Sequence, residues 1–287
     1  MKGLSLFSIL FFFAVSIKAQ PGADTTRIID TASLDMKALA QELAGNAKDN
    51  FGKAKNILNW LSKSFAWTAT DYNTRTVKQI LVRRGGNCFE LARVYMALIK
   101  ELGINYRPVA EVNLHVQSER RKNSAEQKVK EAGNRMSVFG FQHNDHRWIE
   151  VYDDKSKEWI PVDPTTNLIG FDNWLKGRAW FGERHTLNDD LSHDMITPFA
   201  IWVVDPNNST RMVEERTVVY MVEKLNALYA NRLANLPSWK AYTQQLQELS
   251  KHANNAFAGT ENLHDYNDLI EKFRITYEKL KVEFANR

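Results

Sequence analysis

The sequence has little cysteine, little net charge and no internal repeat. Its 287 residues include one cysteine, Cys88, so an intramolecular disulfide is excluded. It carries 38 Lys and Arg against 34 Asp and Glu, a formal charge of +4. That excess is too small for the basic stripe of a nucleic-acid-binding protein, so no nucleic-acid partner is expected. With 44% apolar residues, a chain of this length can bury a core without disulfides or metals to support it.

Long apolar runs are missing except at the N-terminus. Residues 4–17 are apolar, Lys2 precedes them, and Ala19 places a small residue before Gln20. This pattern predicts a secretory signal peptide, residues 1–19, that is cleaved after Ala19. The alternative is a membrane anchor, but a run of about 14 residues is shorter than the roughly 20 that a spanning helix needs. We therefore expect an exported protein, periplasmic or secreted, with no membrane span after cleavage.

A lone cysteine in an exported protein has three explanations. It is buried and inert, it pairs with a second chain, or it is a free reactive thiol. The sequence around Cys88 favours the third. Two glycines precede it as a tight turn, Asn87 suits a helix N-cap, and apolar residues then recur at helical spacing up to Leu102. Cys88 is thus expected in the first helical turn, where the helix dipole and free N–H groups lower a thiol pKa.

Two further residues complete a catalytic pattern. His146 begins a β-rich run, and Asp163 ends the next one after a turn at residues 153–157. Antiparallel pairing centred on Ser156, or one residue to either side, brings Asp163 beside His146.

This combination suits nucleophilic catalysis. A Cys88 thiolate would attack, His146 would serve as general base and then as general acid, and Asp163 would orient the imidazole. Amides of the glycine turn could contribute to an oxyanion hole. We expect Asp163 to be a partly exposed residue of the site.

Three sequence blocks carry a family resemblance. AKNILNWLSKSFAWTAT, RRGGNCFELARVYMALIKELGINYRPVAEV and HRWIEVYDDKSKEWIPVDPT cover roughly residues 51–166, and together they resemble the transglutaminase-like superfamily. The resemblance implies a papain-like α+β fold, in which the nucleophile helix packs on an antiparallel sheet. It also implies that Cys88 is the nucleophile, His146 the base and Asp163 the orienting acid. Such proteins include cross-linking acyltransferases, peptidases, amidases and non-catalytic members.

The oxyanion and substrate-binding residues are less well marked. In cross-linking members of the family an upstream tryptophan stabilises the oxyanion. Trp67 is the candidate for it here, with Tyr72 as an alternative and core packing as the other explanation for Trp67. Asn87 and Trp148 are further candidates for oxyanion or substrate contacts. A transferase would also need an aromatic tunnel for its amine, formed by Trp148, Trp159, Trp174 and Trp180, unless these four pack the sheet and its loops.

The order of patterns predicts three parts. The signal peptide (1–19) precedes a catalytic domain (20–205) with a polar insertion at 117–137, and a helical C-terminal region (206–287) carries three apolar stripes. The insertion is interpreted as solvated and not as a site for an acidic polymer. His143 and His146 lack the HExxH context of a zinc site, and no EF-hand pattern occurs. No metal and no cofactor are therefore expected.

The sequence as a whole favours an exported cysteine hydrolase. It would cleave an amide bond in a peptide, protein or peptidoglycan-like substrate through a thioester on Cys88. One alternative is a protein-glutamine transferase, in which an amine resolves the thioester. The other is a non-catalytic binding protein with a partner surface on its C-terminal helices. The oligomeric state is left open.

Overall fold

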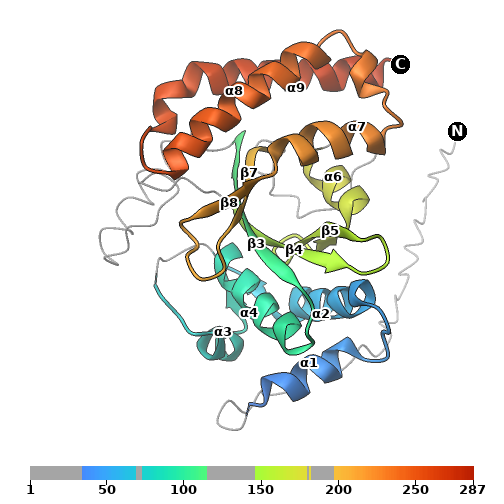
Figure 1. Ribbon diagram of the computed structural model, residues 1–287, viewed down its shortest axis with the longest axis vertical. Helices are drawn as coiled ribbons and strands as arrows, with labels where there is room; N and C mark the ends of the chain where they lie inside the picture. Colours follow the sequence, from blue (N-terminus) through green and yellow to red (C-terminus); the bar gives the residue numbers. More distant parts are fainter. Residues whose placement is uncertain (1–33, 69–72, 115–145, 180, 182–196) are drawn as a thin grey trace, which may run out of the picture.

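The computed structural model describes residues 34–68, 73–114, 146–179, 181 and 197–287 (Figure 1). The helices are α1 (Met36–Ala44), α2 (Asn50–Ser64), α3 (Val77–Arg83), α4 (Cys88–Glu101), α6 (Phe171–Ala179), η3 (Val219–Lys224), α7 (Leu225–Leu228), η4 (Leu233–Asn235), α8 (Trp239–Phe257), η5 (Leu263–Tyr266) and α9 (Asn267–Ala285). The strands are β1 (Ala66–Trp67), β2 (Gly85–Gly86), β3 (Tyr106–Asn113), β4 (His146–Asp153), β5 (Glu158–Asp163), β6 (Leu168–Ile169), β7 (Pro198–Val204) and β8 (Met212–Glu215).

Six strands form one antiparallel sheet in the order β6-β5-β4-β3-β7-β8. In the β4–β5 hairpin Ile149 pairs with Val162, which centres the pairing between residues 155 and 156. This register confirms the one expected from the sequence. The short strands β1 and β2 form a separate parallel pair.

Helices cover both faces of the sheet. Figure 1 shows α2 and α4 on one side, and α6, α7 and the α8–α9 pair on the other. Alternation along β4 explains this: Ile149 joins the cluster with the buried residues of α2 and α4, whereas Trp148 joins the cluster with α6 and the C-terminal helices. The expected α+β fold with a helical C-terminal region is confirmed.

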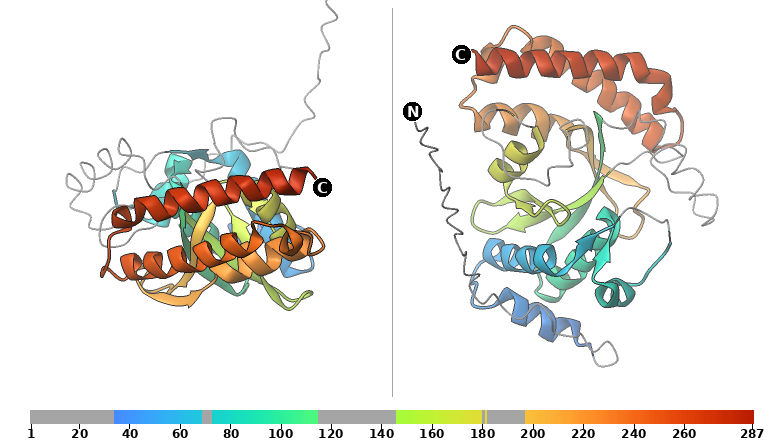
Figure 2. Two further views of the ribbon diagram at one scale, coloured as in Figure 1. Left: turned by 90° about the horizontal axis from the view of Figure 1, so that it is seen from above. Right: turned by 180° about the vertical axis from the view of Figure 1, so that it is seen from behind.

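The buried residues of the C-terminal helices α8 and α9 belong to the same hydrophobic cluster as Trp148. Figure 2 shows α8 and α9 lying side by side across the top of the molecule. Trp202 of β7 stacks on Phe257 of α8, with ring centroids 4.8 Å apart. The domain limits at residues 205 and 206 stay a prediction. The expected signal peptide (1–19) and insertion (117–137) lie outside the described residues. Within the described ranges, no helix is both long and apolar enough to cross a bilayer.

Candidate active site

The two glycines before Cys88 form a strand, whereas the sequence suggested a tight turn. Gly85 pairs with Ala66 and Gly86 with Trp67, in parallel. Both positions are crowded. A Cβ on Gly85 would lie 2.9 Å from the Ala66 carbonyl oxygen, and one on Gly86 would lie 2.7 Å from Glu90 Cβ. Only glycine therefore lets β2 lie this close to β1 at one position and to the first turn of α4 at the next.

The start of α4 is fixed by a reciprocal cap. Asn87 Oδ1 accepts a hydrogen bond from the Glu90 N–H at 3.0 Å, and Glu90 Oε2 accepts one from the Asn87 N–H at 3.2 Å. Buried Glu90 is also paired with Arg75 at 2.8 Å. The expected N-cap role of Asn87 is confirmed. Cys88 is consequently the first residue of the helix, where backbone N–H groups lack helical acceptors and the dipole favours an anion.

Replacing Gly86 by alanine is expected to disturb this arrangement. The new methyl group would press against the Glu90 side chain, which is fixed by its cap and ion pair and has little freedom to move. We expect a loss of about 1–3 kcal/mol in the free energy of unfolding, the usual range for overpacking. Urea titration measures it. Alanine at Gly103, where no atom lies within 4 Å of a built Cβ but φ is +68°, controls for backbone strain alone.

The structure brings Cys88, His146 and Asp163 together. His146 Nε2 lies 2.8 Å from Asp163 Oδ2. The Cys88 thiol hydrogen-bonds the His146 side chain, and the backbone N–H of Arg147 donates to the same sulfur. His146, the first residue of β4, thus lies between Cys88 at the start of α4 and Asp163 at the end of β5. The three groups form the chain that nucleophile, base and orienting acid require.

The charges of these groups support one another. Burial opposes ionisation of Cys88, but hydrogen bonds from His146 and the Arg147 N–H, with the imidazole's charge, hold the thiol pKa below its ordinary value. Burial would lower the pKa of His146, but the Asp163 carboxylate and the Cys88 thiolate raise it to about 10. The arrangement therefore favours a thiolate–imidazolium pair at neutral pH.

Asp163 is fully buried, contrary to the partial exposure expected from the sequence. Its Oδ1 accepts from the N–H groups of Thr165 and Thr166 at 3.0 and 3.4 Å. Its Oδ2 receives His146 and also Arg178, whose Nη1 lies 2.9 Å away. Burial would raise the pKa of Asp163, but the His146 charge and hydrogen bond, then the Arg178 charge, hold it well below its usual range.

Sequence reasoning missed two residues of this site. Arg178 of α6 bridges Asp163 and Glu111 of β3, and all three side chains are buried. Residues 168–200 show no clear period, so α6 was not expected. Glu111 could have been suspected, because it is a charged residue between the apolar residues Ala110 and Val112 of β3.

Trp148 lies elsewhere than the sequence suggested. It is fully buried, it donates its indole N–H to Glu111 Oε2 at 2.7 Å, and its ring contacts Trp174 and Tyr220. The expectation that Trp148 contacts an oxyanion or substrate is therefore corrected. Trp148 lies on the same face of β4 as His146 but two residues further along the strand, where Trp174 of α6 and Tyr220 of η3 cover it.

Trp67 lies on the surface, on the strand that pairs with the segment leading into Cys88. It is 58% exposed, and the β1–β2 ladder places it opposite Gly86. Core packing is thus excluded as the explanation for Trp67. Its role at an oxyanion stays a prediction. The other candidate, Tyr72, lies outside the described residues.

A metal site was not expected from the sequence. Among the residues that the structure describes, no group of three or more His, Cys, Asp or Glu side chains is arranged to hold a metal ion. His143 lies outside this part of the chain.

Part of the chain matches a known family. Residues 37–164 match the transglutaminase-like superfamily, which confirms the resemblance found in the sequence. No curated protein matches the chain.

Solved structures similar to this chain include a candidate cysteine protease from Cytophaga hutchinsonii, at 18% identity and a TM-score of 0.33, covering 49% of this chain and 39% of that one. A candidate protease from Parabacteroides distasonis has 13% identity and a TM-score of 0.31, with 45% and 26% covered. A chain of the Rad4–Rad23 complex bound to a 6-4 photoproduct UV lesion has 12% identity and a TM-score of 0.38, with 86% and 53% covered. The chain therefore spans less than two thirds of each of these proteins.

Proposed function

Because residues 37–164 match the transglutaminase-like superfamily, we propose that this protein is an exported cysteine hydrolase that cleaves an amide bond. The observation that carries the proposal is the contact chain from Cys88 through His146 to Asp163. The substrate class is a peptide, a protein or a peptidoglycan-like amide. Export rests on the N-terminal pattern of residues 1–19.

The reaction starts from the thiolate–imidazolium pair. Cys88 Sγ attacks the carbonyl carbon, and His146 gives its proton to the departing amine as the C–N bond breaks. A thioester remains on Cys88. His146 then takes a proton from water, the water oxygen attacks the thioester carbon, and the C–S bond breaks to release the acid and restore the thiolate. Asp163 stays ionised throughout and stabilises the imidazolium in each half.

Negative charge on the carbonyl oxygen needs donors. The backbone N–H of Cys88 lies at the start of α4, where a helix has no acceptor for it. Exposed Trp67, held opposite Gly86, offers an indole N–H from the neighbouring strand. We assign these two groups to the oxyanion.

Hydrolysis is favoured over amine transfer by the placement of the tryptophans. A transferase needs an apolar tunnel that admits an amine and excludes water. Trp148 and Trp174, two of the four residues that could line one, are fully buried among the core side chains. Trp159 contacts the Arg107 guanidinium, whose carbon lies 4.5 Å from the ring centroid. Trp180 lies outside the described residues.

The experiment supplies a glutamine- or amide-bearing peptide together with excess primary amine. Mass spectrometry then reads how much free acid and how much amine adduct forms. We expect mostly acid, because Trp148 and Trp174 pack in the core and do not line a path for an amine. A product that is mainly the adduct contradicts hydrolysis and supports the transferase. Cys88→Ala should form neither product, and unchanged turnover in that variant would contradict both enzymes.

A further inference from the structure

We propose that Arg178 is a positioning residue of this active site, which holds Asp163 ionised and directed at His146. The inference rests on the proposed function, because it concerns the same thiol chemistry. Arg178 acts through Asp163 and does not itself contact a reacting atom.

The contacts of Arg178 fix its guanidinium on both sides. Nη1 lies 2.9 Å from Asp163 Oδ2, the oxygen that also receives His146, and Nη2 pairs with Glu111 Oε1. The guanidinium carbon lies 5.0 Å from the Trp174 ring centroid. The carbonyl of Arg178 accepts the Thr197 hydroxyl at 3.0 Å. The side chain is 1% exposed, so water does not screen these charges.

A buried carboxylate needs such a partner. Away from water, Asp163 would take up a proton, and a protonated carboxyl no longer stabilises an imidazolium. The imidazolium in turn holds the Cys88 thiolate. The charge of Arg178 therefore reaches the nucleophile through two steps.

Glu111 increases the need for a positive charge beside Asp163. It is a second fully buried carboxylate, and its pKa is raised because burial outweighs the attraction of Arg178 and His146. Two carboxylates share one guanidinium, so without it they would compete for protons. The charged groups around Asp163 and Cys88, within the described chain, are His146 and Arg147 on β4, Glu111 on β3 and Arg178 on α6.

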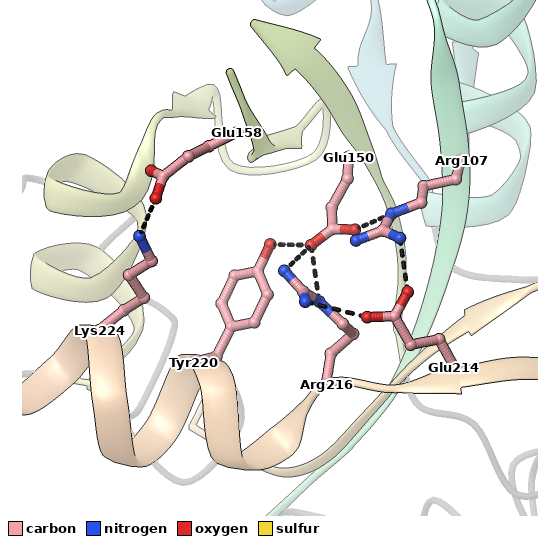
Figure 3. Close-up of polar contacts among 7 residues, drawn as sticks. All are labelled: Arg107, Glu150, Glu158, Glu214, Arg216, Tyr220 and Lys224. Carbon is pink, nitrogen blue, oxygen red and sulfur yellow. Dashed lines mark hydrogen bonds and ion pairs between the residues drawn. The ribbon is translucent and has the colours of Figure 1, made fainter. Parts of the chain in front are cut away.

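A second ion cluster on the same strand provides the comparison. Figure 3 shows Glu150, further along β4, facing Arg107, Arg216 and Tyr220, with Glu214 closing the ring. Arg216 links β4 to the C-terminal region, as Arg178 links α6 to the sheet. None of the contacts drawn in this ring includes the proposed catalytic residues. Arg216→Gln is therefore a matched control for the loss of a partly buried ion pair.

The test is the pH dependence of Cys88 alkylation by iodoacetamide, which reports the thiolate alone because the chain has one cysteine. In Arg178→Gln the apparent pKa of Cys88, taken as the midpoint of the alkylation profile, is expected to rise by at least about one unit. Arg178→Lys keeps the charge and should recover most of that shift. Arg216→Gln should melt at a lower temperature with an unchanged profile.

The outcomes separate the two proposals. An ordinary thiol profile in the wild-type protein overturns the proposed function. A wild-type thiolate at low pH together with an unshifted, folded Arg178→Gln overturns only the positioning role.

If Arg178→Gln does not fold, Glu111→Gln decides. In this variant the guanidinium of Arg178 has only the carboxylate of Asp163 to neutralise. The glutamine amide oxygen can still accept the indole N–H of Trp148, although some stability is lost. The apparent pKa of Cys88 should then fall, and an unchanged or higher value overturns the positioning role.

Discussion

Alkylation of Cys88 at pH 6 is expected to slow at least about 100-fold when His146 is replaced by alanine. In the native site burial opposes ionisation of the thiol, and the hydrogen bond and charge of His146 overcome it. Alanine removes both favourable contributions and leaves the burial. The pKa of the thiol should then return to its ordinary value or above it, where only a small fraction is thiolate at pH 6.

The direction of the pH dependence follows from the pKa shifts of Cys88 and His146. Thiolate exists above the lowered pKa of Cys88, and imidazolium exists below about 10, the raised pKa of His146. The alkylation profile of the wild-type protein should therefore have its midpoint at a lower pH than the profile of the alanine variant. Iodoacetamide labelling followed by intact-mass spectrometry measures both. Equal rates for the two proteins at pH 6 would show that His146 does not support the thiolate. Replacement of His252, which pairs with Glu261 away from the site, should leave the rate unchanged.

The second large effect concerns Asp163→Asn. We expect turnover of an amide substrate to fall by about 10³ to 10⁴, the loss seen when the orienting carboxylate of a triad becomes an amide. An asparagine carries no charge, and its NH₂ group faces the donors of His146 and Arg178. The imidazolium then has no counter-charge, and the ring loses its fixed orientation.

The same variant should also lose stability. Asp163 is fully buried, and its removal leaves Arg178 with only Glu111 to neutralise it. Breaking a buried ion pair costs about 3–5 kcal/mol. Urea titration and steady-state kinetics on the folded fraction separate the two effects.

Asp153→Asn is the matched control for Asp163→Asn. Asp153 is also buried, and it accepts the N–H groups of Lys155 and Ser156 at the β4–β5 turn, away from the triad. The Asp153→Asn variant should be less stable than the wild-type protein and should keep its turnover unchanged. Full activity in folded Asp163→Asn would point to a Cys–His dyad.

The sequence predicted the parts of the site that follow from local patterns. The cap, the helix start at Cys88 and the hairpin register all come from neighbouring residues, and each has the expected place. The family resemblance added that the helix carrying Cys88 packs on the sheet that carries His146, which no local pattern shows.

The part that could not be predicted depends on contacts between distant segments. Arg178 lies in a short helix with weak amphipathic pattern, and only the folded sheet brings it to Asp163. The burial of Asp163 was missed for the same reason, since α6 covers the end of β5. Trp148 was misplaced for a similar reason, because the side chains that bury it, Trp174 of α6 and Tyr220 of η3, come from segments later in the sequence.

The position of β3 in the sheet has a consequence for the newly made chain. β3 pairs on one side with β4 and on the other with β7, and both strands follow it in the sequence. His146 and Asp163 also leave the ribosome after Cys88. Until those late segments emerge and pair, the thiol has no imidazole beside it and keeps ordinary reactivity. The growing polypeptide, which is itself rich in amide bonds, is thus synthesised before its own nucleophile is activated.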